Sequence, residues 1–416
     1  MSDQDYPSPP PLVIRDARVL TMGAGSGPRR GGDLGELGAI DGCDIEIVDG
    51  VVRQIGPDLD VEPDEDLGVI DAGGAVVMPA FVDCHTHACW AGERLDEWDQ
   101  KRAGASYLEL LEAGGGIMST VRAVRDASDD LLAALLFARR AAMLEHGSCA
   151  IEVKSGYGLS TAAELLMLDA IDANAGTPTQ HVTPTACVGH AIDGNPDAFV
   201  AQTIGETLPA VHDEFPGVAI DAYCERGAWS LEQCLRLFDR ALELGHPVRV
   251  HADQFNDLGM IPEAIRRGFL SVDHLEASTP EHLEMLAESD TFGVMLPCSG
   301  WHTDGRYADG RAFVDAGGTL AIATNYNPGS SPCGSMPSAI ALAVRHLGLT
   351  PAEAIGASTV NPAALLGLED SHGRIDVGMP ANLILLRHSD ERMLAYEFGM
   401  NPVMHVIAGG YVLAEW

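Results

Sequence analysis

The sequence is poor in lysine and in positive charge. Only two of its 25 basic residues are lysines, Lys101 and Lys154, and 61 acidic residues leave a formal net charge of −36. A surface of this kind repels polyanions, so we expect neither nucleic acid nor an anionic membrane as a partner. The acidity fits either a strongly solvated surface or adaptation to a saline cytoplasm, in which salt screens the self-repulsion.

Paired-cysteine motifs and long apolar runs are also missing. The nine cysteines are scattered along the chain without a Cys-x-x-Cys pair, and their odd number favours reduced thiols. No apolar run reaches membrane-spanning length, and the N-terminal segment lacks the basic start and apolar block of a secretory signal. We therefore expect a cytoplasmic protein.

The pattern of strands and helices divides the chain into two parts. Short β-type segments separated by Asp-Gly and Gly-Gly turns dominate both ends, whereas eight apolar strand candidates alternate with helical stretches between them. This pattern predicts an α/β fold with a (β/α)8 barrel in residues 77–374. A small β-sandwich domain is predicted from residues 1–76 together with 375–416. A doubly wound open sheet is the alternative, but no Gly-x-Gly-x-x-Gly motif follows the first strand candidate.

Histidines recur where the strand candidates end. His85 and His87 follow the first apolar run, and the alternation of a strand points them to the same side. His251 and His274 end the fifth and sixth candidates, and His190 lies in the loop after the third. The carboxyl ends of barrel strands share one face, so these imidazoles are expected to meet there.

Such a cluster predicts metal-assisted hydrolysis. His85, His87 and His251 can hold one divalent zinc or iron ion and leave a position for water, whose pKa the ion lowers. His274 is then available as the base for that water or as the group that orients it. A two-metal site bridged by a carbamylated lysine is not expected, because the fourth strand candidate contains no lysine.

Longer motifs carry a family resemblance. FVDCHTH, followed by the histidines of the fifth and sixth strand candidates, resembles the amidohydrolase superfamily. DCHTHACWAGERLDEW, EVKSGYGLSTAAELLML, ADQFNDLGM and NPGSSP resemble more specifically the imidazolonepropionase family of histidine degradation, over a range from about Asp71 to the C-terminus. The resemblance implies a homodimer that hydrolyses the ring amide of 4-imidazolone-5-propanoate to N-formimidoyl-L-glutamate.

The resemblance also implies roles for individual residues. Metal ligands are implied at His85, His87, His251 and Asn325, and catalytic roles at His274, Gln254 and Asn325. Arg94 suits the propanoate carboxylate through a bidentate guanidinium, and Tyr107 is a weaker candidate for the same contact. The remaining substrate contacts are implied at Tyr157, His190, Gln254, Asn327, Gly329 and Ser330.

The chain departs from the family pattern at the end of the eighth strand candidate. Asn325 stands where the family has aspartate, and Gln254 is neutral as well. An amide oxygen binds a metal weakly and cannot accept a proton at neutral pH. Three interpretations remain open: a natural variant in which His274 is the base, a related amidohydrolase or deaminase acting on another heterocycle, or a catalytically impaired binder.

Overall fold

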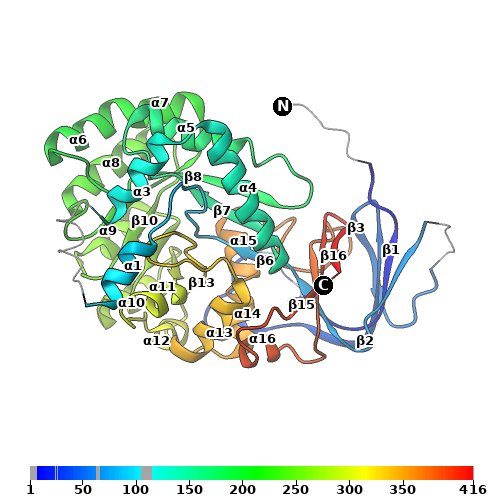
Figure 1. Ribbon diagram of the computed structural model, residues 1–416. Coiled ribbons are helices and arrows are strands. Elements are labelled where there is room, and N and C mark those ends of the chain that lie inside the picture. The colour runs from blue at the N-terminus through cyan, green and yellow to red at the C-terminus, as the bar shows by residue number, and fades with distance from the viewer. Residues whose placement is uncertain (1–6, 24, 26, 62–65, 105–114, 416) are drawn as a thin grey trace.

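The protein consists of a helix-covered barrel and a smaller sheet beside it (Figure 1). The computed structural model describes residues 7–23, 25, 27–61, 66–104 and 115–415. Tyr107, a predicted substrate contact, lies outside these residues. The larger body contains the middle of the chain, and the smaller one contains segments from both ends.

Eight strands of the middle segment form one sheet in which sequence neighbours pair in parallel. They are β6 (Phe81–Asp83), β7 (Ser148–Lys154), β8 (His181–Gly189), β9 (Ala219–Cys224), β10 (Arg249–Ala252), β11 (Ser271–His274), β12 (Phe292–Met295) and β13 (Leu320–Ile322). Their residues are almost all buried, as expected for parallel strands that are covered by helices on one side and filled with side chains on the other. The predicted eight-stranded α/β barrel is confirmed.

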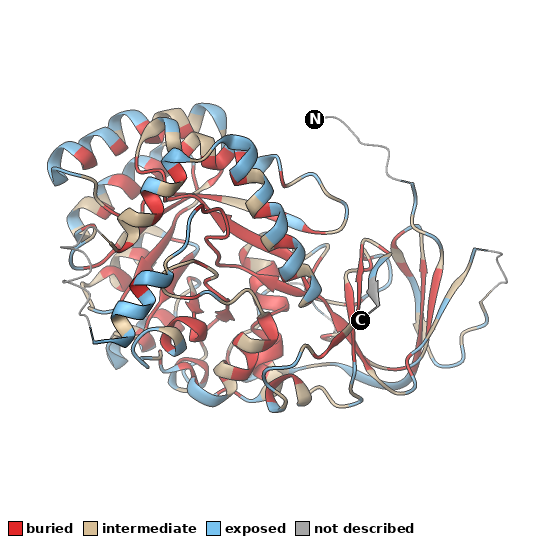
Figure 2. Ribbon diagram, in the orientation of Figure 1, coloured by how far each residue is buried: buried red, intermediate tan, exposed pale blue. Residues whose placement is uncertain are grey.

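Helices cover the outside of this barrel, with their exposed faces outward and their buried faces against the strands (Figure 2). Several begin at a Ser or Thr whose side-chain oxygen accepts a backbone N–H of the first turn, as at Ser128, Ser160 and Ser230. Their bounds are α1 (Leu95–Arg102), α3 (Ile117–Asp126), α4 (Asp129–Glu145), α5 (Thr161–Asp172), α6 (Pro196–Gln202), η2 (Thr203–Thr207), α7 (Leu208–Glu214), α8 (Leu231–Glu243), α9 (Met260–Arg267), α10 (Pro280–Ala287), α11 (Pro297–His302), α12 (Gly310–Asp315), α13 (Met336–His346), α14 (Pro351–Gly356), α15 (Val360–Leu365) and α16 (Met393–Tyr396).

The barrel closes between its first and last strands through a buried carboxylate. Asp83 accepts hydrogen bonds from the backbone N–H of Thr324 at 3.1 Å and from its hydroxyl at 2.5 Å. Just beyond, the backbone N–H of Asn325 donates to the carbonyl of His85 at 3.0 Å. Thr86 and Tyr326 form an isolated parallel β-bridge. Asp83 thus holds the segment after β13 against the segment after β6, which are the two segments that contain Asn325 and the His85–His87 pair.

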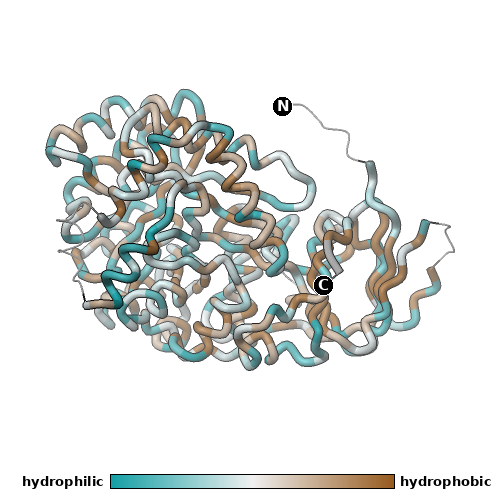
Figure 3. Tube along the Cα trace, viewed as in Figure 1, coloured by the Kyte–Doolittle hydropathy of each residue, from teal (hydrophilic) through white to brown (hydrophobic). Residues whose placement is uncertain are grey.

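The smaller body is an eight-stranded mixed sheet built from both ends of the chain. The C-terminal strand β14 pairs with the N-terminal strand β5, and β5 continues to Pro79. The sheet has its own apolar core, and its strands are predominantly hydrophobic (Figure 3). Its elements are β1 (Leu12–Leu20), β2 (Ala39–Val48), β3 (Val51–Gly56), β4 (Gly68–Asp71), β5 (Val76–Pro79), β14 (Leu383–Leu386), β15 (Val403–Ala408) and β16 (Tyr411–Glu415), and η1 (Gly31–Gly35) lies between β1 and β2.

Two further features bear on the predictions from composition. All nine cysteines lie among the described residues and are free thiols, as their scattered arrangement predicted. Within the described ranges, no helix combines the length and the apolar character needed to cross a membrane.

Candidate active site

Four imidazoles meet at the carboxyl ends of the barrel strands. His85 and His87 follow β6, His251 lies in β10, and His274 ends β11; all four are at most 2% exposed. One ring nitrogen from each of His85, His251 and His274 lies within 4.8 Å of the other two. His87, His190 and His251 form a second such group, so the predicted ligands His85, His87 and His251 are divided between two groups that share His251.

The geometry of this histidine cluster fits a metal ion. The Nε2 atoms of His87 and His251 are 3.1 Å apart, and Nε2 of His85 is buried without a hydrogen-bond partner. Two ligand nitrogens of a tetrahedral ion with bonds of about 2.0–2.1 Å are separated by roughly 3.3 Å. Burial lowers the pKa of His85, and burial together with the neighbouring His190 and His251 lowers that of His87. The rings are therefore neutral, which is the protonation state that binds metal.

Carboxylates behind the cluster fix the direction of two of these rings. Nδ1 of His85 lies 2.6 Å from Asp273, and Nδ1 of His251 lies 3.0 Å from Asp221. A carboxylate accepts the proton of Nδ1, so the lone pair of Nε2 points into the cluster. Both carboxylates are 0% exposed and were not identified from the sequence.

Two buried cations neutralise this layer of carboxylates. Lys154 Nζ lies 2.9 Å from Glu152 and 2.8 Å from Asp221, while Arg249 Nη2 lies 2.7 Å from Asp273. Burial acts to lower the pKa of Lys154, but the surrounding carboxylates outweigh it and raise this pKa. Lys154 is thus an ion-pair partner of the carboxylates behind the histidines.

His190 and Tyr157 form one wall next to the cluster. The rings of His190 and His87 stack with centroids 4.6 Å apart, and the rings of Tyr157 and His190 are 5.1 Å apart. Burial and the nearby His251 lower the pKa of His190 to about 3, so this ring is neutral. The structure thus brings two predicted substrate contacts to the predicted metal ligands.

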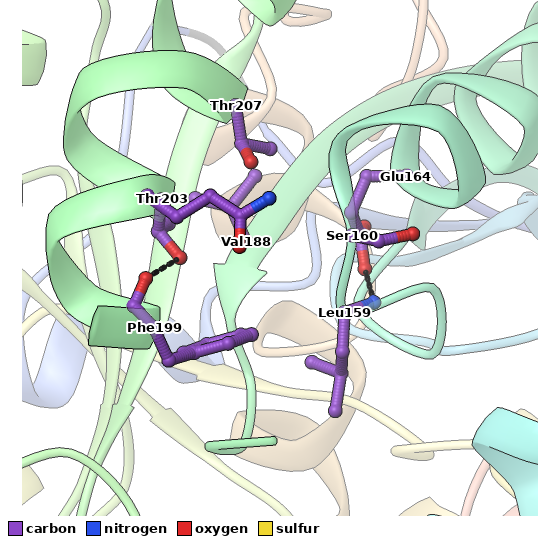
Figure 4. A pocket seen from close by; sticks show the side chains of 8 residues that line it. Leu159, Ser160, Glu164, Val188, Phe199, Thr203 and Thr207 are labelled. Atoms are coloured by element: carbon purple, nitrogen blue, oxygen red, sulfur yellow. Dashed lines mark hydrogen bonds between the residues drawn. The ribbon is translucent and has the colours of Figure 1, made fainter. Parts of the chain in front are cut away.

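The turn that contains Tyr157 is held by a buried glutamate. Glu164, in the first turn of α5, accepts backbone N–H bonds from Gly156, Gly158 and Leu159 at 2.7–2.9 Å. Figure 4 shows the bond to Leu159 beside a cavity of about 10 Å³, which has room for about one water molecule. None of the residues that line this cavity belongs to the histidine cluster.

Arg94, which directly precedes α1, lies against the loop after β13. Its guanidinium donates to Glu97 at 2.9 Å through Nε and 2.6 Å through Nη2, and a Cβ added at Gly329 would collide with its Nη1. A larger residue at position 329 would therefore displace the end of the Arg94 side chain. Asn327 orders the same loop, because its Oδ1 accepts from the backbone N–H of Gly329 and of Ser330 at 2.9 and 2.8 Å.

The side chains of Asn325 and Gln254, which are neutral, each form hydrogen bonds with named partners. Nδ2 of Asn325 donates to the Ser299 hydroxyl at 2.8 Å, and its Oδ1 accepts from Asn327 at 3.1 Å. Oε1 of Gln254 accepts from the hydroxyl of Tyr223 at 2.7 Å. The ring of Tyr223 lies 6.0 Å from that of His251, which places Gln254 at the edge of the cluster.

The predicted base also has a partner. Nδ1 of His274 lies 3.2 Å from Glu276, and the backbone of His274 is left-handed with φ of 96°. Non-glycine residues rarely adopt such a conformation, and when they do it is often at a functional site. Glu276 adds a carboxylate within reach of the cluster that the sequence analysis did not single out.

Sequence and fold comparisons agree with this geometry. Residues 76–412 match the model of the amidohydrolase family. Imidazolonepropionase of Herpetosiphon aurantiacus is 43% identical, covering 97% of this chain and 96% of the relative, and that of Symbiobacterium thermophilum is 39% identical, covering 97% of both. Among solved structures, the 5-methylcytosine deaminase of Klebsiella pneumoniae is similar in fold, with a TM-score of 0.74, 17% identity and 97% of each chain covered.

Proposed function

Because this chain belongs to the amidohydrolase family and, within it, to the imidazolonepropionases, we propose that the histidine cluster is the active site of that reaction. The enzyme hydrolyses the ring amide of 4-imidazolone-5-propanoate, and the product is N-formimidoyl-L-glutamate. The observation that carries the assignment is the close approach of His87 Nε2 and His251 Nε2 at 3.1 Å beside the unpartnered Nε2 of His85. Nδ1 of His251 faces Asp221, so Nε2 of His251 is an acceptor, and either a proton on Nε2 of His87 or a shared cation can bridge the two nitrogens. The unpartnered Nε2 of His85 beside them favours the cation.

His85, His87 and His251 are the proposed ligands of one divalent ion, zinc or iron, because neutral imidazoles suit both. When bound, such an ion lowers the pKa of a coordinated water and polarises the ring carbonyl. Asp273 and Asp221 keep the Nε2 lone pairs of His85 and His251 directed at it. Asn325 is proposed as a fourth, weak ligand through Oδ1, which already accepts one hydrogen bond from Asn327 and retains a second lone pair.

His274 is the proposed proton carrier of the reaction. It takes a proton from the attacking water as the water oxygen bonds to the ring carbonyl carbon, and it returns that proton to the ring nitrogen as the C–N bond breaks. The carboxylate of Glu276 stabilises the imidazolium that exists between these two transfers. Tyr223 donates to Oε1 of Gln254, so the amide N–H groups of Gln254 are free to donate to the substrate ring.

The remaining residues are proposed to bind the substrate. Arg94 holds the propanoate carboxylate at the place where the loop of Asn327, Gly329 and Ser330 meets its guanidinium. Tyr157 and His190 pack against the ring. Tyr107 is retained as a second candidate for the carboxylate on the strength of the family resemblance alone.

We also propose a cytoplasmic homodimer, with the barrel in residues 77–374 and the small domain in 1–76 and 375–416. The nine free thiols support a reducing compartment. Tyr396, Phe398 and Met400 are 65–77% exposed, and such a group of large apolar side chains supports a subunit interface. Light scattering on a Phe398→Asp variant tests this, because a dimer held through this face dissociates.

The test of the proposed function is turnover of imidazolone propanoate by metal-analysed protein, beside His274→Ala and Asn325→Asp variants. We expect an active wild type and a loss of at least 100-fold in kcat for His274→Ala. A silent wild type that Asn325→Asp revives would instead identify a binder that has lost its proton acceptor. If none of the three turns over with metal bound, the substrate assignment is wrong.

A further inference from the structure

A second group of metal-binding side chains lies outside the histidine cluster. One ligand atom from each of Asp253, Asp257 and His282 lies within 4.8 Å of the other two. Asp253 follows β10, Asp257 lies in the loop before α9, and His282 lies in the first turn of α10. None of these residues takes part in the proposed reaction.

Hydrogen bonding around this group leaves one buried oxygen without a partner. Asp253 is 1% exposed; its Oδ2 accepts from the Ser278 hydroxyl at 2.7 Å, but its Oδ1 contacts no donor among the described residues. A buried carboxylate oxygen without a partner is unfavourable unless a cation, a proton or a water satisfies it. Oδ1 of Asp253 therefore needs a partner that the described side chains do not supply.

The other two side chains are placed to supply the rest of a coordination shell. Oδ2 of Asp257 lies 2.6 Å from Nδ1 of His282, and these side chains are 14% and 22% exposed, so the group opens towards solvent on one side. Two of the three side chains are carboxylates, so the group itself supplies negative charge for a cation.

We propose that Asp253, Asp257 and His282 bind a second divalent cation of the zinc or manganese type. Two carboxylates and one imidazole match the ligand preferences of these ions, whereas calcium disfavours the imidazole. On binding, the hydrogen bond between Nδ1 of His282 and Asp257 breaks, the ring carries its proton on Nε2 after exchange with solvent, and Nδ1 coordinates the ion. The open side of the group leaves a position for water.

The position of this site suggests what the ion does. It joins the loop after β10, which contains Gln254, to the first turn of α10. That loop is already joined to the start of α10 by the 2.6 Å hydrogen bond between Asp257 and His282 and by a 3.4 Å bond from the backbone N–H of Thr279 to Asp257. A cation would replace the first of these with bonds to both segments and hold Gln254 in its place beside Tyr223.

The test is the number of zinc ions bound per chain after metal removal, reloading and dialysis. The proposal is tested by the difference in zinc ions bound per chain between wild type and His282→Gln. This difference does not depend on whether the histidine cluster is filled. We expect His282→Gln and Asp257→Asn each to bind one zinc fewer than wild type, with affinity for that equivalent lowered more than tenfold. His87→Ala is expected to lose the other equivalent.

The control is Asp290→Asn, which removes a fully exposed carboxylate just beyond the same helix and should bind as much zinc as wild type. His282 is partly exposed, so its replacement is compatible with folding, and circular dichroism verifies this. Equal zinc content in wild type and His282→Gln overturns the proposal, as does a loss in Asp290→Asn of the same size, which would mean adventitious binding to an acidic surface.

Discussion

Replacement of Lys154 by methionine tests the buried ion pairs beneath the histidine cluster. Lys154 is 0% exposed and lies within 3 Å of Glu152 and Asp221, so the substitution removes the buried lysine from Asp221 and leaves Glu152 with Arg249, 2.7 Å away. Removal of one partner from a buried ion pair typically costs about 3–5 kcal/mol. We expect a decrease of that size in the free energy of unfolding at pH 7, measured by urea denaturation.

The chain offers a matched control, because its only other lysine is Lys101 in α1. Lys101→Met removes the same charge from a partly exposed position and is expected to change stability by less than about 1 kcal/mol. Burial acts to raise the pKa of Asp221, yet His251 and Lys154 lower it well below its usual value. Loss of Lys154 thus also raises the pKa of Asp221, the carboxylate that contacts Nδ1 of His251. Equal stability of the two variants would refute the role assigned to the network.

Three further predictions concern other buried contacts. Asp273→Asn weakens the 2.6 Å contact to His85 and should lower zinc affinity about 10–100-fold, measured by competition with a chelator. An unchanged zinc affinity would show that this carboxylate does not orient the ring. Tyr223→Phe removes the donor to Gln254 and should lower kcat/KM about 5–20-fold with unchanged thermal stability; a variant as active as wild type would contradict the role of this bond. Burial and the nearby His181 lower the pKa of His372 to about 4, below the value of about 6.5 expected in the unfolded chain. The unfolded state therefore binds the extra proton, so this contribution to stability is complete above pH 6.5 and is lost as the pH falls towards 4. His372→Gln should lose about 2–3 kcal/mol less than wild type between pH 7 and pH 4.5 in denaturant titrations, and equal losses would contradict the assignment.

The barrel and the histidine cluster could be predicted because their signals are local. His85 and His87 are two residues apart on one strand, and the apolar runs that precede His251 and His274 mark two more strands. The rule that all strand ends of a barrel share one face then brings these residues together. Each inference needs only the chain within a few residues and one general property of the fold.

The layer behind the histidines could not be predicted in this way. Asp273 contacts His85 across 188 residues of sequence, and Asp83 contacts Thr324 across 241. A single Asp within an apolar strand indicates a buried partner but not which one. The Tyr223–Gln254 bond is hidden for the same reason, because its two residues lie on neighbouring strand ends with a helix between them.

The roles of Asn325 and the proposed domain boundaries remain predictions. The structure gives Asn325 two hydrogen-bond partners, Ser299 and Asn327, which explains how its amide is oriented. The strand that begins at Val76 continues to Pro79 within the small sheet. Sequence composition changes gradually there, because β5 of the small sheet and β6 of the barrel are adjacent apolar segments.

The central claim is that the histidine cluster holds the ion on which hydrolysis depends. The most direct test is the rate of imidazolone propanoate hydrolysis by metal-free protein as zinc or iron(II) is added, beside His87→Ala. We predict negligible activity without metal, a rise to a plateau once the cluster is filled, and no such rise in His87→Ala. Full activity of the metal-free protein, or an equal response of His87→Ala, would contradict it.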